Sequence, residues 1–135
     1  MDTTSSLQIP GARLERIERS DNEITLHFSL VHLVQVMEGA FQDSLWKQAC
    51  NLVIRDVEIN GVLPECPCEI QGGDMLNNIY TYRDHAPLPI DWNGSVGCRF
   101  TVAGSGAVFS IDGTVMQMKM IDHPRYIRHI DKTWR

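Results

Sequence analysis

The sequence has no apolar run approaching the about 20 residues that a membrane-spanning helix needs. Residues 1–11 are polar and contain neither the basic segment nor the apolar segment of a secretory signal peptide. We therefore expect no membrane partner and a cytoplasmic location. In that reducing compartment Cys50, Cys66, Cys68 and Cys98 are expected to be free thiols.

Sequence motifs that are typical of catalytic sites are also missing. The chain has no Gly-x-Ser-x-Gly nucleophile elbow. Its Gly104-Ser105-Gly106 segment is followed by no lysine, as a phosphate-binding loop would require, and is typical of a hairpin turn. The Cys66-Pro67-Cys68 pair is spaced more tightly than zinc ligands usually are, and no second pair accompanies it. We expect no cofactor, and the absence of any catalytic constellation favours a non-enzymatic role.

The charge is unevenly distributed. The net charge is −5, but residues 119–135 hold five basic and two acidic side chains. The preceding part of the chain is correspondingly acidic, and an acidic body repels phosphate backbones. We therefore expect no nucleic-acid partner.

Alternation of apolar and polar residues indicates β-strands along most of the chain. In residues 23–30, Ile24, Leu26 and Phe28 alternate with polar residues, which is the period of a half-buried strand. The same pattern covers residues 50–59 and 96–121. It shifts phase at Arg55-Asp56 and again near Gly113, where we expect β-bulges.

Three segments are harder to assign. Residues 62–93 are rich in proline and glycine, so they predict a long loop with short strands at 69–71 and 79–82. Residues 31–48 combine helical spacing with β-branched residues and Gly39, and we expect an irregular or helical insertion there. Residues 124–134 predict a short C-terminal helix, with Pro124 in its first turn.

Together these patterns predict a mainly β protein: an antiparallel barrel or sandwich of about six to eight strands. We expect residues 1–11 to be a flexible lead-in and residues 12–135 to form a single β-rich domain.

The candidate binding residues fall into two groups. Tyr80, Tyr82 and Trp92, with His85, belong to the proline-rich segment, and tyrosine and tryptophan are enriched at binding hot spots. Met116 and Met118 lie on one face of a strand and could line an apolar cavity. In both groups, packing in the core is the alternative interpretation.

Three functions remain open. The first is a non-enzymatic module that binds another protein or assembles with itself through residues 62–93 and the C-terminal segment. The second is a carrier that holds a small apolar ligand inside the barrel. The third is a hydrolase or metal-dependent enzyme that uses Cys66, Cys68 and His85.

Overall fold

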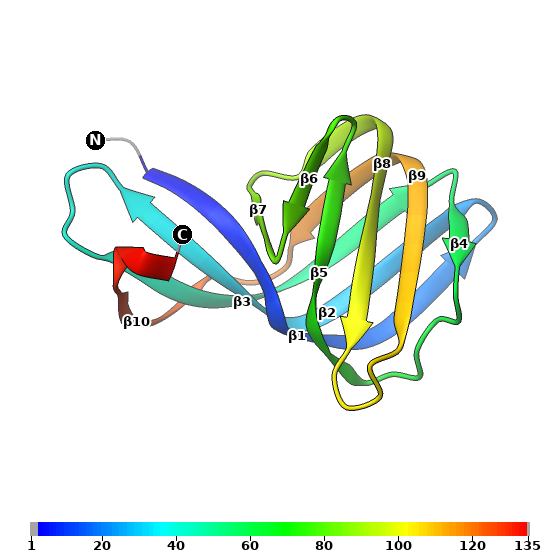
Figure 1. Ribbon diagram of the computed structural model, residues 1–135, viewed down its shortest axis with the longest axis horizontal. Helices are drawn as coiled ribbons and strands as arrows, with labels where there is room; N and C mark the ends of the chain where they lie inside the picture. The colour runs from blue at the N-terminus through cyan, green and yellow to red at the C-terminus, as the bar shows by residue number, and fades with distance from the viewer. Residues whose placement is uncertain (1–2, 135) are drawn as a thin grey trace.

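The computed structural model describes residues 3–134 and contains ten strands and one short 3₁₀ turn (Figure 1). The elements are β1 (Thr3–Ser20), β2 (Glu23–Met37), β3 (Asp43–Arg55), β4 (Glu58–Asn60), β5 (Cys68–Asn77), β6 (Tyr80–Arg83), β7 (His85–Pro87), β8 (Asp91–Val102), β9 (Val108–Met120), β10 (Arg125–Ile130) and the turn Lys132–Trp134. Every strand pairing is antiparallel.

Six strands close into a barrel in the order β1, β2, β3, β9, β8 and β5. The closing seam is short: β5 pairs with β1 only from Cys68 to Ile70, opposite Leu14 to Ala12. The predicted antiparallel barrel is therefore confirmed, and additional strands lie outside it.

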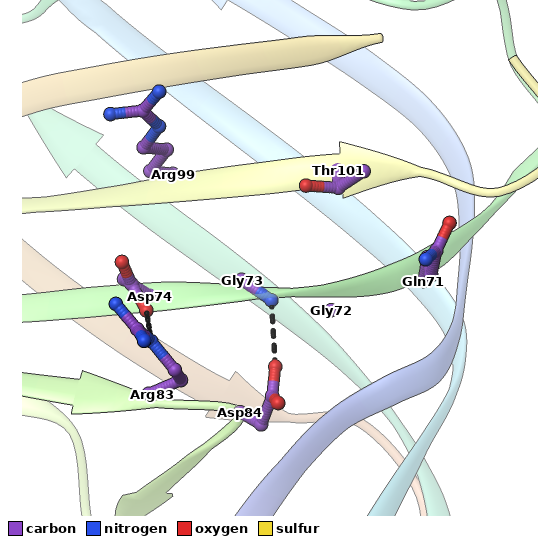
Figure 2. Close-up of a pocket in the computed structure, with 8 residues that line it drawn as sticks. All are labelled: Gln71, Gly72, Gly73, Asp74, Arg83, Asp84, Arg99 and Thr101. Carbon is purple, nitrogen blue, oxygen red and sulfur yellow. Dashed lines mark hydrogen bonds and ion pairs between the residues drawn. The ribbon is translucent and has the colours of Figure 1, made fainter. Parts of the chain in front are cut away.

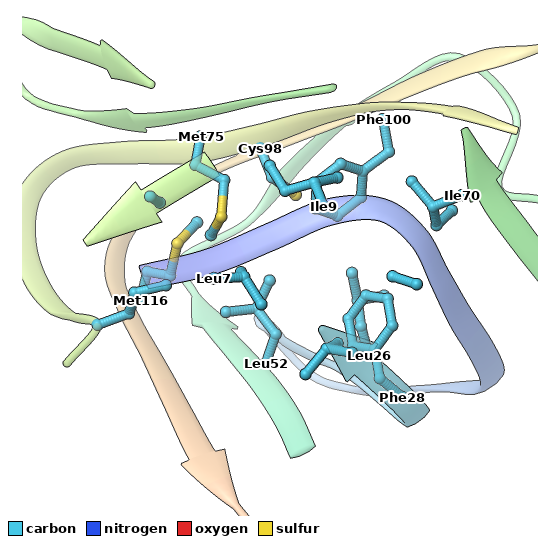
Figure 3. Packing of buried hydrophobic residues seen from close by; sticks show 14 of the residues in the cluster. Leu7, Ile9, Leu26, Phe28, Leu52, Ile70, Met75, Cys98, Phe100 and Met116 are labelled. Atoms are coloured by element: carbon cyan, nitrogen blue, oxygen red, sulfur yellow. The ribbon is translucent and has the colours of Figure 1, made fainter. Parts of the chain in front are cut away.

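The barrel encloses the hydrophobic core (Figure 3). Ile24, Leu26 and Phe28 are buried on β2, as the alternation predicted, and the ring of Phe28 packs edge-on against Phe100 of β8 with centroids 6.4 Å apart. Each of these side chains stabilises the fold by about 1.5–3 kcal/mol when it is fully buried. The core therefore supplies the rigid frame on which the outer strands are held.

Beyond the barrel, the long strands continue into a second sheet, which we call the wing (left in Figure 1). The wing consists of residues 3–8 of β1, 31–37 of β2 and 43–48 of β3, flanked by β7 and β10. Register shifts mark the passage from barrel to wing on both β1 and β2. From Thr3 onward the expected flexible lead-in is a paired strand of this sheet, while residues 1 and 2 lie outside the described residues.

The irregular or helical insertion predicted at residues 31–48 is wrong. β2 runs on to Met37, and β3 starts at Asp43 after a turn that contains Gly39 at φ +84°. The β-branched residues Val31, Val34 and Val36 favour a strand. Pairing between β2 and β3 forms backbone hydrogen bonds along both segments, more than a short helix could form.

The predicted C-terminal helix is also wrong, since residues 125–130 form β10 and only a 3₁₀ turn follows. A helix of this length has little stability of its own, whereas the open edge of β3 offers backbone partners. Tyr126 also packs edge-on against Trp46 of β3, with ring centroids 5.5 Å apart. Tertiary pairing therefore overrides the local helical pattern.

The two predicted phase shifts face each other. β3 ends at Arg55, where Asp56 has a positive φ of 56°, and β4 then continues along β9. Gly113 of β9 lies opposite this break, because a Cβ there would come within 2.4 Å of the Arg55 carbonyl oxygen. The alternation of both strands changes at one shared bend in the barrel wall.

Candidate binding groove

The predicted loop of residues 62–93 contains the three strands β5, β6 and β7. The direction of the chain between β6 and β7 is set by the backbone of Asp84. Asp84 adopts a positive φ of 63° and donates its N–H to the Gly73 carbonyl oxygen at 2.7 Å. Its own carbonyl accepts the N–H of Ile9 at 2.8 Å. Asp84 thus ends β6 beside β5 and turns the chain so that β7 pairs with β1.

A groove of about 360 Å³ lies where β6 and β7 face the wing. Its lining residues are Thr4, Ser5, Ser6, Val36, Tyr82, His85, Pro87 and Trp134. The walls are mainly aromatic and aliphatic, and the hydroxyl groups of β1 supply polar positions. This size and composition match sites that bind part of a ligand or peptide.

Aromatic contacts organise one side of the groove. The rings of Tyr80 and Tyr82 stack with centroids 6.3 Å apart, and Tyr82 lies 5.8 Å from Trp92. Trp92 is 9% exposed, and it supports Tyr82 from behind rather than lining the groove. Tyr80 is 58% exposed and extends the aromatic surface outward along β6.

His85 forms a second contact across the groove, edge-on to Trp134 with ring centroids 5.8 Å apart. Of the four residues proposed from the proline-rich segment, Tyr82 and His85 line the groove, and Tyr80 and Trp92 contact the ring of Tyr82. No local pattern in the sequence indicates that Trp134 lies beside them, because residues 124–134 predict a helix.

Trp134 is held by a buried carboxylate on the wing. Asp43, which is 1% exposed, accepts a hydrogen bond from Trp134 Nε1 at 2.6 Å. The ammonium group of Lys132 lies 3.0 Å from the other carboxylate oxygen. A charged hydrogen bond of this kind is shorter and stronger than a neutral one, so it fixes the indole as a wall of the groove.

β6 also has an open edge. It pairs with β5 on one side and with no other strand among residues 3–134. Residues of an antiparallel strand alternate between bonding one neighbour and the other. Asp84 bonds to Gly73 of β5, so Tyr82 and Tyr80, at every second position, also direct their backbone N–H and C=O groups toward β5. Thr81 lies between them and directs its N–H and C=O to the open side.

The outer face of the β5–β6 hairpin carries a shallow polar pocket of about 300 Å³ (Figure 2). Asp74 lies between Arg83 of β6 and Arg99 of β8, its cross-strand neighbours. The Nε of Arg83 is 3.3 Å from an Asp74 oxygen. The Asp84 carboxylate instead accepts the N–H of Gly73 at 3.0 Å.

The two methionines proposed for a ligand cavity occupy different environments. Met116 is fully buried in the core, and Met118 is half-buried at the mouth of the barrel. The void beside Met118 inside the barrel measures only about 10 Å³, about the space of one water molecule. A larger groove of about 440 Å³ lies outside the mouth, lined by Met118, Met120, Leu33, Leu88 and Ile90 among others.

The cysteines are dispersed. Burial raises the pKa of Cys50 and of Cys98 to about 12 in the core. Cys66 and Cys68 lie beside each other near the barrel seam, and burial raises the pKa of Cys68 to about 11. His85 is distant from them, since it pairs with Gln8 of β1 whereas Cys68 pairs with Leu14. Within residues 3–134, no three His, Cys, Asp or Glu side chains are grouped to hold one metal ion.

The part of the chain that the structure describes contains no helix with the length and hydrophobicity needed to cross a membrane. When the chain is compared with protein-family models, with curated proteins and with solved structures, nothing matches it.

Proposed function

We propose that this protein is a non-enzymatic binding module that takes an extended segment of another protein along β6. The observation that carries the proposal is the aromatic groove formed by Tyr82, His85 and Trp134 beside an unpaired strand edge. Strand addition to such an edge derives affinity from backbone hydrogen bonds and specificity from pockets for alternate side chains.

The free edges of the molecule differ in ways that support β6 as the binding edge. β10 carries Arg125 and Arg128 and an irregular register, both of which discourage pairing with another chain. The exposed residues of β4 include the acidic Glu58. β6 instead presents Tyr80 and Tyr82, the kind of residue that dominates binding hot spots.

The proposal is tested by selecting a phage-displayed library of twelve-residue peptides on the immobilised protein. We expect enriched peptides that bind in solution, and we expect Trp134→Ala to weaken them at least about 10-fold, the loss of one hot-spot side chain. Tyr126→Ala removes an exposed aromatic residue of β10 outside the groove and serves as the matched control.

Thr81→Pro tests the strand edge itself. Proline removes one N–H that points to the open side and leaves the ladder with β5 intact, which is how edge strands tolerate it. We expect an unchanged melting temperature within a few degrees and a loss of peptide binding.

Failure to enrich any peptide would contradict the proposal. A stable dimer of the wild-type chain that Thr81→Pro dissociates would replace it with self-assembly through β6. The assays are run in reducing buffer, because we propose a cytoplasmic location for a chain with four free cysteines.

A second candidate is an apolar-ligand carrier that uses the groove at the mouth of the barrel. Its support is the 440 Å³ groove lined by Met118, Met120 and Leu88, since methionine adapts to irregular apolar ligands. Titration with a fluorescent long-chain fatty acid tests it. Saturable binding that Met118→Lys abolishes is the expected result, and binding that this variant leaves unchanged would rule it out.

A further inference from the structure

We infer that the segment bound along β6 alternates apolar residues with at least one acidic residue, and that Arg83 selects the acidic one. This inference rests on the proposed function and adds the chemistry of the partner. It starts from the two faces of the β5–β6 hairpin.

Successive residues of a strand point to opposite faces of the sheet. Tyr80 and Tyr82 share the face that lies over the groove, and Tyr82 pairs with Met75 of the core. Thr81 and Arg83 therefore share the outer face, on which Figure 2 shows Arg83 beside Asp74. A strand added beside β6 follows the same alternation, so every second side chain enters the aromatic groove and the intervening ones neighbour Thr81 and Arg83.

Charges on the outer face already alternate across the strands. Arg99 of β8, Asp74 of β5 and Arg83 of β6 are cross-strand neighbours in that order. Opposite charges that face each other across strands are stabilising, and like charges are destabilising. The next position in this row lies on the incoming strand, and an acidic residue continues the alternation there.

Arg83 retains capacity for that contact. Its side chain is 81% exposed, and its Nε makes the ion pair with Asp74 at 3.3 Å. A guanidinium has five N–H donors, and the one hydrogen bond of the Arg83 side chain within the described residues runs from Nε to Asp74. The nearest other acid, Asp84, directs its carboxylate to the Gly73 N–H of β5 and does not occupy the open edge (Figure 2).

The net charge limits how acidic the partner is. Because the chain carries a net charge of −5, a polyacidic segment would be repelled at long range. The fitting partner therefore has an isolated acidic residue between apolar or aromatic residues, not an acidic run.

The test uses two synthetic peptides that differ only in sign: a central Phe-Asp-Phe or Phe-Lys-Phe sequence within the same neutral flanks. Dissociation constants are measured by fluorescence anisotropy. We expect the aspartate peptide to bind the wild-type protein about 3-fold more tightly, in line with an exposed ion pair. The preference should shrink in 0.5 M salt, because such pairs are screened.

Two variants of Arg83 sharpen the result. Arg83→Glu should reverse the preference, and Arg83→Gln, which preserves more of the polar contact with Asp74, should abolish it. Arg99→Glu makes the same charge change two strands away from β6, about 10 Å farther, and serves as the matched control that should retain the preference.

The possible outcomes distinguish a failure of the inference about Arg83 from a failure of the proposed function. If both peptides bind equally and Arg83→Glu changes nothing, the inference is wrong and strand addition stands. If Arg99→Glu shifts the preference as much as Arg83→Glu does, the effect is long-range and the inference is again wrong. If neither peptide binds and library selection also fails, the proposed function itself is wrong.

Discussion

Gly73 of β5 lies directly against the backbone of β8. A Cβ at this position would come within 2.2 Å of the Arg99 carbonyl oxygen and 2.8 Å of the Phe100 ring. Backbone cannot move aside as a flexible side chain can, so Gly73→Ala should destabilise the fold by about 2–3 kcal/mol, as overpacking does. The loss is measured by urea unfolding.

Gly104 provides the comparison for this prediction. It lies in the β8–β9 turn at φ +87°, and a Cβ there would meet no atom within 4 Å. Gly104→Ala should destabilise the fold only by the cost of placing alanine in the left-handed conformation, about 1–2 kcal/mol. Equal losses in the two variants would show that contact with β8 is not what requires glycine at position 73.

Asp122 makes stability depend on pH. The N–H of Ala49 donates to its carboxylate at 3.0 Å and Arg125 lies 3.2 Å away, and these contacts hold the pKa of Asp122 below its usual range. A lowered folded-state pKa contributes stability above the unfolded pKa of about 3.9, and that stability is lost as the pH falls through the folded value. Asp122→Asn should therefore be less stable than wild type at pH 7.

The difference between Asp122→Asn and wild type should close as the pH is lowered from 5 towards 2, and urea unfolding at several pH values measures it. Asp91→Asn, at an exposed carboxylate whose contact is with Gln117, controls for loss of charge alone. A gap that stays constant down to pH 2 would contradict the assignment to Asp122 ionisation.

At the scale of elements, β10 closes the outer edge of the wing and protects it. Its own outer edge pairs with no strand among the described residues, yet it carries Arg125 and Arg128. Positive side chains on an edge strand oppose edge-to-edge association. Replacing both arginines with valine should therefore promote association.

We expect Arg125→Val with Arg128→Val to raise the apparent mass in sedimentation velocity at concentrations where wild type is unchanged. The control replaces Arg99, which lies on β8 within the barrel, with valine. Association in the control to the same extent would point to general loss of solubility rather than to the β10 edge.

At the scale of the whole molecule, the sequence predicted the barrel better than the wing. Alternation is strong wherever one face is buried in the core, as in Ile24, Leu26 and Phe28. In the wing, Val31, Leu33 and the adjacent Val34 are all buried, so burial does not alternate strictly, and residues 31–37 show a mixed pattern that resembles a helix as much as a strand. β10 depends on the free edge of β3, a distant partner that no local pattern reveals.

The candidate groove was predicted in part for the same reason. Tyr80, Tyr82, His85 and Trp92 come from one segment, so their proximity followed from the chain itself. Trp134 donates a hydrogen bond to the buried carboxylate of Asp43, 91 residues earlier in the chain, and this bond holds it beside them. The burial of an acidic residue such as Asp43, at the start of a strand with polar neighbours, cannot be predicted from the sequence.

β1, β2 and β3 run through both barrel and wing. We expect the wing to open at lower free energy than the barrel, and we expect opening of the barrel to open the wing as well. The barrel interior is fully buried, whereas wing positions such as Met37 remain 45% exposed. Regions with less buried apolar surface open at lower free energy. Hydrogen exchange should therefore be slowest at residues 24–28 and 50–54 and faster at residues 34–37 and 43–47.

Two substitutions test whether that order is fixed. Trp46→Ala removes the contact with Tyr126 and should accelerate exchange in the wing alone. Leu26→Ala leaves a cavity in the barrel that costs about 2–5 kcal/mol, and it should accelerate exchange in both parts, because the wing strands continue from the barrel. If Trp46→Ala accelerated the slowest barrel amides equally, barrel and wing would be one cooperative unit, and the groove between them could not open without unfolding the whole chain.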